Sequence, residues 1–194
     1  AGAAAGMTAI FWSPISAILL SIELLLFEFR PRSFIPVAFA TVVAMSLRPF
    51  VFGSGPMFSL PDIPEASQGA LLGYAVEGIV MGICAVGIAK SVYWIEDLFE
   101  HLPIHWMWWP ALGGVAVGTI GFFYPDTLGV GYDNIDKILE GAFVGKALAA
   151  FCLMKFLSWV IALGSGTSGG TLAPVFTIGG GIGVLTGELL SALF

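Results

Sequence analysis

Near its C-terminal end the sequence contains a glycine-rich stretch between two long apolar runs. The stretch, Gly-Ser-Gly-Thr-Ser-Gly-Gly-Thr-Leu-Ala-Pro, occupies residues 164–174, and the apolar runs occupy residues 147–163 and 175–194. Each glycine in a helix interior costs about 1 kcal/mol relative to alanine, so the four glycines disfavour a continuous helix. We therefore expect two helices separated by a break.

The start of the second helix has the features of an anion site. Pro174 lacks an N–H group and has a fixed φ, which suits the first helical turn. Thr171 and Leu172 would then lie at or just before the helix N-terminus, where backbone N–H groups have no partner within the helix. The macrodipole adds a partial positive charge there. Such a site can hold an anion inside a membrane without a full positive charge.

The same stretch also has a simpler interpretation as an ordinary helix N-terminus. The hydroxyl of Thr167 or Ser168 could cap the second helix by accepting a hydrogen bond from one of its first N–H groups. The residue pattern alone favours this simpler interpretation over an anion contact.

The composition indicates a membrane protein. Only 10% of the 194 residues are charged and 58% are hydrophobic, whereas a soluble domain carries about 25% charged residues. We therefore predict an all-α polytopic membrane protein that lies in the lipid bilayer. Because no basic run accompanies the net charge of −6, a nucleic-acid partner is not expected.

The apolar segments differ in length. The runs at 15–27 and 33–47 are short for a crossing of the ~30 Å hydrocarbon core. Residues 68–102 contain no proline and predict one long, tilted helix, whereas 104–124 and 146–163 predict spans. Together with the glycine break, this mixture predicts discontinuous helices that meet inside the membrane.

Two ionisable side chains lie inside apolar runs, where such groups are costly and often functional. For Glu23, a polar or proton-handling role competes with a structural one, in which it reaches the interface or caps a neighbouring helix. Lys155 could pair with an acid in the bundle or attract anions at long range. Glu77 lies near the start of its helix, where the macrodipole favours a carboxylate, and we assign it no chemistry.

The sequence contains no convincing catalytic or metal-binding pattern. His101 and His105 are four residues apart, but Leu102 replaces the glutamate of the zinc motif H-E-x-x-H and Pro103 interrupts the helix. The serines of the glycine-rich stretch have no histidine or aspartate nearby, and a G-K-[ST] phosphate loop is missing. The two cysteines are far apart in apolar runs and are interpreted as small hydrophobic residues. We expect no enzyme activity, no metal and no cofactor.

Several blocks of the sequence resemble motifs of the CLC chloride channels and transporters. Residues 164–174 are similar to the family signature G-S-G-x-x-G-G-x-F-x-P. Residues 1–6, 11–14 and 21–24 resemble the segment G-A-A-A-G … F-N-A-P … I-E, and residues 30–36 fit the basic linker that follows. The blocks occur in the family order with matching spacing, and the resemblance covers essentially the whole chain.

The resemblance implies a homodimer with one anion pathway in each subunit. In that family, two inverted repeats bring helix N-termini to a central chloride. By analogy, this chain is part of the transmembrane domain: residues 1–50 end the first repeat, 51–66 form an extramembrane loop, and 67–194 begin the second repeat. Residues 15–47 would face the other subunit.

The resemblance also assigns the anion contacts. The backbone N–H groups of Thr171 and Leu172 would point at the chloride beside Gly170, which favours the anion interpretation over a simple cap. The other members of the signature would support the loop, namely Gly164, Ser165, Gly166, Gly169 and Pro174. The family's gating-glutamate loop would lie upstream of Ala1, so we expect a fragment of a larger protein.

The sequence departs from the family pattern at three places. Leu172 replaces the usual phenylalanine, and Trp12-Ser13 replaces the Asn-Ala of F-N-A-P. Proton-coupled members often carry Glu-Glu where this chain has Glu23-Leu24, and leucine cannot carry a proton. We therefore expect a voltage-gated, channel-like chloride transporter of the plasma (inner) membrane. A proton-coupled exchanger that uses another acid such as Glu28, and a structural scaffold without transport, are the alternatives.

Overall fold

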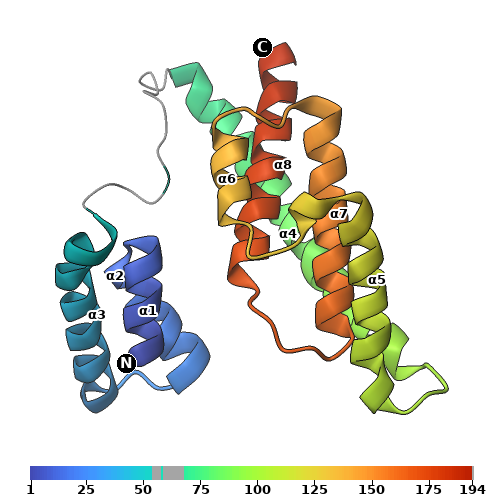
Figure 1. Ribbon diagram of the computed structural model, residues 1–194. Helices are drawn as coiled ribbons and strands as arrows, with labels where there is room; N and C mark the ends of the chain where they lie inside the picture. The colour runs from blue at the N-terminus through green and yellow to red at the C-terminus, as the bar shows by residue number, and fades with distance from the viewer. Residues whose placement is uncertain (54–57, 59–67, 194) are drawn as a thin grey trace. The chain divides into compact units, whose positions relative to one another are not determined.

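Every regular element that the computed structural model describes is a helix. The structure describes residues 1–53, 58 and 68–193, and the predicted all-α class is confirmed in them. The chain forms two compact units, Ala1–Ser59 and Leu60–Phe194 (Figure 1).

Among the described residues, four helices are long and apolar enough to cross a membrane. They are Pro31–Phe52, Gly69–Glu100, Gly145–Gly164 and Leu172–Ser191.

In the first unit, two helical segments end at left-handed residues that are not glycine. Helix α1 (Gly2–Phe11) ends at Trp12, with φ of 50°. Helix α2 (Pro14–Ser21) continues into a π-helical turn, η1 (Ile22–Leu26), which ends at Phe27 with φ of 52°. Glycine usually occupies such positions, because a side chain there costs about 1–2 kcal/mol. As predicted, the apolar segment made by α2 and η1 is too short to be a full span.

Helix α3 (Pro31–Phe52) is longer than the sequence indicates. The run at 33–47 is predicted to be short, but α3 has 22 residues and passes through Pro36 and Pro49. Membrane helices tolerate proline because neighbouring groups can satisfy the freed carbonyl oxygen. The first two residues of the predicted loop at 51–66 therefore belong to α3, and most of the loop lies outside the described residues.

Arg48 connects the C-terminal end of α3 to that of α1. Its side chain is buried, and Nε donates a hydrogen bond to the carbonyl oxygen of Ala9 at 2.8 Å, while Nη1 donates to that of Gly53 at 3.3 Å. The guanidinium also lies 4.1 Å from the centroid of the Trp12 ring. A cation at a helix C-terminus is favourable because orphan carbonyl groups carry partial negative charge there. Arg48 therefore stabilises the turn that follows α1.

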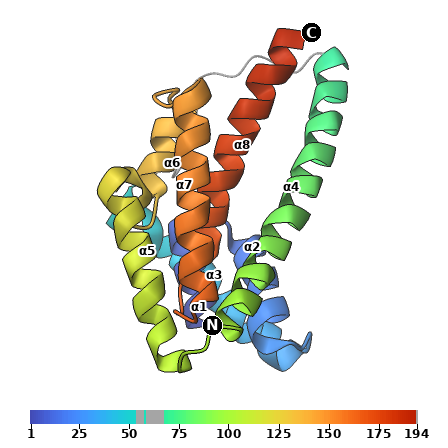
Figure 2. The ribbon, with the colours of Figure 1, turned by 90° about the vertical axis from the view of Figure 1, so that its right-hand side faces the viewer.

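The second unit is a bundle in which α8 (Leu172–Leu193) packs against three other helices. Its partners are α4 (Gln68–Glu100), α6 (Tyr132–Leu139) and α7 (Gly145–Gly164). Helix α4 runs along one side of the bundle and is tilted relative to α7, as Figure 2 shows. The long helix predicted from residue 68 and the span predicted at 146–163 are both confirmed.

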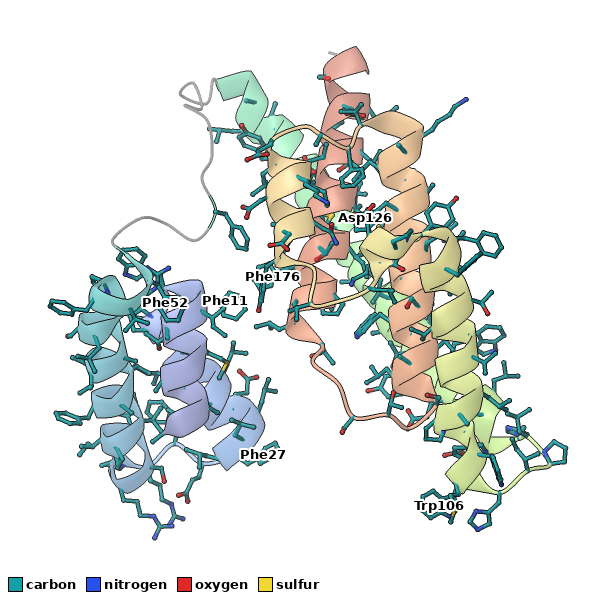
Figure 3. The ribbon with its side chains drawn as sticks, in the orientation of Figure 1. Phe11, Phe27, Phe52, Trp106, Asp126 and Phe176 are labelled. Atoms are coloured by element: carbon teal, nitrogen blue, oxygen red, sulfur yellow. The ribbon has the colours of Figure 1, made fainter. Side chains whose placement is uncertain are left out.

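The span predicted at 104–124 is wrong in its length. Helix α5 (Trp109–Phe123) has 15 residues, about 22 Å of helix. A 3-10 turn, η2 (Trp106–Trp108), precedes it. His105 caps that turn, since its Nδ1 atom accepts a hydrogen bond from the Met107 amide at 3.3 Å. Trp106 is exposed at one end of the unit (Figure 3).

A small buried cluster joins α6 and α7. It consists of Ile138, Leu148, Phe151 and Cys152, and the ring of Phe143 stacks on that of Phe151 at a centroid distance of 5.2 Å. Val184 and Leu185 of α8 pack against the same cluster.

Gly179 and Gly183, which are four residues apart on α8, make only loose contacts with α4. A Cβ atom added to Gly179 would lie 3.8 Å from Met81 Cε, and one added to Gly183 would lie 3.6 Å from Glu77 Oε1. Both are ordinary van der Waals distances. The close approach involves Gly181 instead, where an added Cβ atom would overlap Cys152 Sγ of α7.

Replacing Gly181 with alanine should destabilise the protein. The new Cβ atom would overlap Cys152 Sγ and lie 3.4 Å from Leu148 Cδ1, and overpacking of this kind costs about 1–3 kcal/mol. Thermal unfolding of the detergent-purified full-length protein measures the effect. Gly180→Ala is the matched control, because its Cβ atom would meet nothing within 4 Å. Equal stability of the two variants would contradict the prediction.

Candidate anion site

The break in the helix begins at Ser165 and ends at Thr171. Gly164 is the last residue of α7, and the amides of Ser165 and Gly166 donate to the carbonyl oxygens of Ile161 and Leu163 at 2.9 and 3.1 Å. Gly166 has φ of 79°, which is the left-handed position that favours glycine at a helix end. The predicted break is therefore confirmed, but it is shorter than the 164–174 signature, because Leu172 to Pro174 already belong to α8.

Two hydroxyl groups satisfy the last turn of α7. The Ser165 hydroxyl donates to the carbonyl oxygen of Ala162 at 2.7 Å, and the Thr167 hydroxyl donates to the same oxygen. Thr167 therefore caps the end of α7, and the prediction that it could cap α8 is wrong. No side-chain hydrogen bond of Ser168 is found within the part of the chain that the structure describes.

The start of α8 leaves three amide N–H groups without an acceptor among the described residues, those of Thr171, Leu172 and Ala173. The carbonyl oxygen of Thr171 accepts the first bond of α8, from the Val175 amide at 3.1 Å, which confirms the predicted helix start. Within the described residues, no group accepts a hydrogen bond from the amide of Thr171 or Leu172. The first turn of α8 contains no acidic side chain. Unpaired donors at the positive end of a helix dipole suit an anion.

The residues before α8 are open to the surroundings of this chain. Gly169, Gly170 and Thr171 are exposed, whereas Leu172 is half-buried. A Cβ atom added to Gly169 or Gly170 would meet nothing within 4 Å. Packing within the described chain therefore does not require glycine at these two positions, and the space beside the two amides is free.

Lys155 is buried in α7 and bonded to backbone carbonyl groups. Its Nζ atom donates to the carbonyl oxygen of Thr127 at 2.7 Å and to that of Gly129 at 3.0 Å, and the residue is only 3% exposed. Among the described residues no acidic side chain forms an ion pair with it, so the predicted pairing with an acid is wrong. The two carbonyl dipoles replace the water that the ammonium group would otherwise bind.

The segment 127–131 begins at the last residue of the short turn η3 (Pro125–Thr127). It is also bonded to α8. The hydroxyl of Thr177, which is fully buried, donates to the carbonyl oxygen of Ala173 at 2.9 Å and contacts that of Gly131 at 3.4 Å. Because Lys155 holds its other end, this segment connects the two helices that flank the glycine break.

The acidic side chains of the first unit have different surroundings. Glu23 lies exposed in η1, with no hydrogen bond or ion pair to another described residue, so the alternative of a helix cap finds no support. Glu28 accepts hydrogen bonds from the Ser33 hydroxyl and from Arg32 Nη2, the latter at 3.1 Å, and Arg30 Nε lies 3.7 Å away. The bonds from Ser33 and then Arg32 hold the pKa of Glu28 below its usual range.

Glu77 forms a polar contact that the sequence analysis missed. The Thr186 hydroxyl of α8 donates to Glu77 Oε1 of α4 at 2.7 Å. The dipole argument considered only the residue's own helix, and nothing in the sequence pairs two side chains 109 positions apart.

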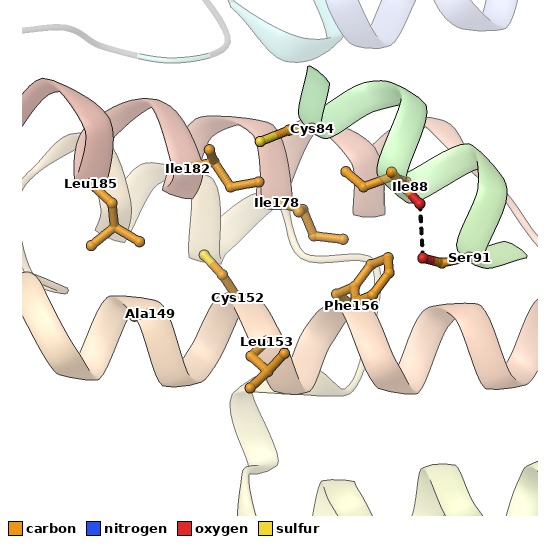
Figure 4. A pocket seen from close by; sticks show the side chains of 11 residues that line it. Cys84, Ile88, Ser91, Ala149, Cys152, Leu153, Phe156, Ile178, Ile182 and Leu185 are labelled. Carbon is orange, nitrogen blue, oxygen red and sulfur yellow. Dashed lines mark hydrogen bonds between the residues drawn. The ribbon is translucent and has the colours of Figure 1, made fainter. Parts of the chain in front are cut away.

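A cavity of about 410 Å³ between α4, α7 and α8 has an apolar lining (Figure 4). Cys84 and Cys152, both free thiols, contribute to it, and the one hydroxyl of the lining, Ser91, donates to the Gly87 carbonyl oxygen at 2.8 Å. No charged side chain lines the cavity, so it does not suit a small anion. Nor does the described part of the chain contain a cluster of three metal-ligating side chains.

Apolar helices of membrane length, together with a helix that begins at unpaired amides, define an integral membrane protein with a candidate anion site. The chain belongs to the voltage gated chloride channel family, whose sequence profile matches residues 1–194. The resemblance found in the sequence motifs is thereby confirmed.

Curated relatives cover the whole chain at moderate identity. The voltage-gated ClC-type chloride channel ClcB of Shigella boydii serotype 18 is 30% identical over 196 residues, which are 100% of this chain and 46% of that protein. Chloride channel protein CLC-e of Arabidopsis thaliana is 28% identical over 207 residues, with 98% and 29% coverage. The chain therefore spans less than half the length of these relatives.

Replacing Lys155 with methionine should destabilise the second unit. The carbonyl groups of Thr127 and Gly129 would lose their donor, and an unpaired carbonyl on a buried residue such as Thr127 costs about 1–3 kcal/mol. Thermal unfolding of the full-length protein measures this loss. Lys146→Met serves as control, because Lys146 is exposed on the first turn of the same helix. An unchanged unfolding temperature in Lys155→Met would show that the two carbonyl groups do not depend on the ammonium.

Proposed function

We propose that this chain forms part of the anion pathway of a chloride-transporting membrane protein, and that chloride binds at the amides of Thr171 and Leu172. The observation that carries the proposal is the pair of N–H groups at the start of α8, which have no acceptor among the described residues. Buried or membrane-embedded donors of this kind need a partner, and an anion provides one.

The mechanism requires no covalent chemistry and no cofactor. A chloride ion that enters the site exchanges water for the two amides, while the dipole of α8 adds partial positive charge. The contact carries no full positive charge, so binding stays weak enough for release, as conduction demands. In this proposal Gly170 lies beside the ion, and the supporting loop consists of Gly164, Ser165, Gly166, Gly169 and Pro174. Lys155, a buried cation on α7, would add a long-range attraction.

The names of the relatives support chloride as the transported ion. ClcB and CLC-e are both described as chloride channels, and each aligns over nearly all of this chain. A structural scaffold without transport would not need a helix break that leaves amides unpaired. For this reason we prefer transport to the scaffold alternative.

Within chloride transport, a channel-like mode is preferred to proton-coupled exchange. Leu24, which is exposed on η1, stands where proton-coupled members often have a second glutamate, and it cannot carry a proton. The lowered pKa of Glu28 keeps that carboxylate ionised at neutral pH, so it is poorly suited to take over the role. Exposed Glu23 stays a candidate for a polar or proton role in the exchanger alternative.

We also propose that residues 15–47 form the contact of a homodimer in the plasma (inner) membrane. This range exposes many large apolar side chains, which suit either a second subunit or lipid: Ile15, Leu19, Leu24, Leu25, Ile35 and Phe39. Residues 1–50 would end the first repeat of the transmembrane domain, 51–66 would link the repeats, and 67–194 would begin the second.

Chloride flux from liposomes that contain the full-length protein tests the proposed site. Gly170→Val should raise the chloride concentration for half-maximal flux about tenfold, because the side chain would fill the free space beside the amides. Thr171→Val should change it less than about twofold, because the backbone amide stays in place. Equal effects of the two variants would contradict the proposed chloride site. Absence of chloride flux in the wild-type protein would contradict the proposed transport function.

The reversal potential of the full-length protein under a pH gradient separates the two modes of transport. A channel should follow the chloride gradient alone, whereas a coupled exchanger shifts with the proton gradient. Glu28→Gln should leave the potential unchanged. Because hydrogen bonds lower the pKa of Glu28 below its usual value of 4.5, their stabilisation is complete above pH 4.5 and is lost as the pH falls through the lowered pKa. A proton-dependent shift that Glu28→Gln abolishes would establish the exchanger with Glu28 as the acid.

A further inference from the structure

The first residue of the helix break is held against α5. Gly113 of α5 and Ser165 are both buried, and Ser165 has no exposed surface. A Cβ atom added to Gly113 would lie 2.6 Å from Ser165 Cβ and closer still to its Oγ atom. Carbon atoms do not pack at such distances, so α5 can approach the end of α7 only because residue 113 has no side chain.

Ser165 cannot relieve such a contact by rotating its side chain. Its hydroxyl is already engaged, because it donates to the Ala162 carbonyl oxygen at 2.7 Å. The Cβ atom of Ser165 is itself within the contact, and its position follows from the backbone. A side chain at position 113 therefore has to displace the backbone at Ser165.

The end of α7 has no room to retreat on the side of α4. A Cβ atom added to Gly164 would lie 2.6 Å from Ile95 Cγ2 and 3.1 Å from the amide nitrogen of Glu96. Two consecutive residues at the exit from α7 are thus in close contact with two different helices. This pair of contacts determines the point at which the loop leaves α7.

From these contacts we propose that Gly113 is a positioning residue for the chloride site at Thr171 and Leu172, an inference that rests on the proposed function. The Gly166 amide and the Thr167 hydroxyl are bonded to the last turn of α7, so the first three residues of the loop move together with Ser165. Only residues 168–170 separate this bonded start from Thr171. A displacement at Ser165 therefore changes where the loop delivers the two amides, and Gly113 acts through Ser165 without touching the ion.

Chloride dependence in Gly113→Ala and Gly114→Ala variants of the full-length protein tests the proposal. Gly114 is the next residue of α5, is exposed, and its Cβ atom would meet nothing within 4 Å. In liposomes, Gly113→Ala should raise the half-saturating chloride concentration about fivefold or more and change the bromide-to-chloride flux ratio, because a displaced site binds less well. Gly114→Ala should stay within about twofold of wild type. A purely structural role would reduce the yield of folded protein and leave both quantities unchanged.

A second substitution tests the route through Ser165. Ser165→Gly removes both atoms of the contact, so in combination with Gly113→Ala it should bring the half-saturating concentration back toward the wild-type value. Should Gly113→Ala fail to fold, Ser165→Gly alone carries the test, because it releases the same brace and should also weaken chloride binding.

The outcomes distinguish the inference from the function on which it rests. Folded Gly113→Ala with wild-type chloride dependence and selectivity would overturn the positioning role and leave the proposed function intact. Wild-type chloride dependence in Ser165→Gly would overturn it in the same way. Absence of chloride transport in the wild-type full-length protein would refute the proposed function itself.

Discussion

The structure of the second unit depends on how the backbone polar groups at the helix break find hydrogen-bond partners. In an apolar bundle each N–H and C=O group needs a partner. At the end of α7, the carbonyl oxygens of Ile161, Ala162 and Leu163 all accept hydrogen bonds from the loop. At the start of α8, the amides of Thr171 and Leu172 have no acceptor among the described residues. Three of the last four carbonyl groups of α7 are thus bonded, whereas the donors at the start of α8 are open, which favours a negatively charged ligand.

The segment 127–131 of the same unit satisfies its polar groups in a different way. Its carbonyl groups are bonded by Lys155 of α7 and approached by Thr177 of α8, so its polar groups are closed off by side chains. That closure ties the two helices of the break to one another. The carbonyl groups of this segment are thus bonded by side chains, whereas the amides at the start of α8 are open.

Local rules of helix formation predicted the position of the break but not its hydrogen bonds. Glycine and proline at 164–174 indicated where one helix ends and the next begins, because both residues act on the backbone next to them. The cap was assigned wrongly, because the Thr167 hydroxyl lies within reach of two helix ends and only the folded loop decides between them. The sequence predicts an acidic partner for Lys155, but its ammonium group donates to the carbonyl oxygens of Thr127 and Gly129, which lie 28 and 26 positions away in the chain. The membrane anion contact itself came from the family motif and is still a proposal.

The sequence by itself determined the membrane class, the long helix α4 and the position of the break, since hydropathy and backbone propensity depend on neighbouring residues. Only the tertiary structure decided which glycines are close contacts. The evenly spaced glycines of α8 face α4 loosely, whereas Gly181 is in close contact with α7 and Gly113 with Ser165, the residue that follows α7. Spacing shows which residues share a helix face. It does not show which face meets a neighbour, because that depends on the packing of segments that are distant in the chain.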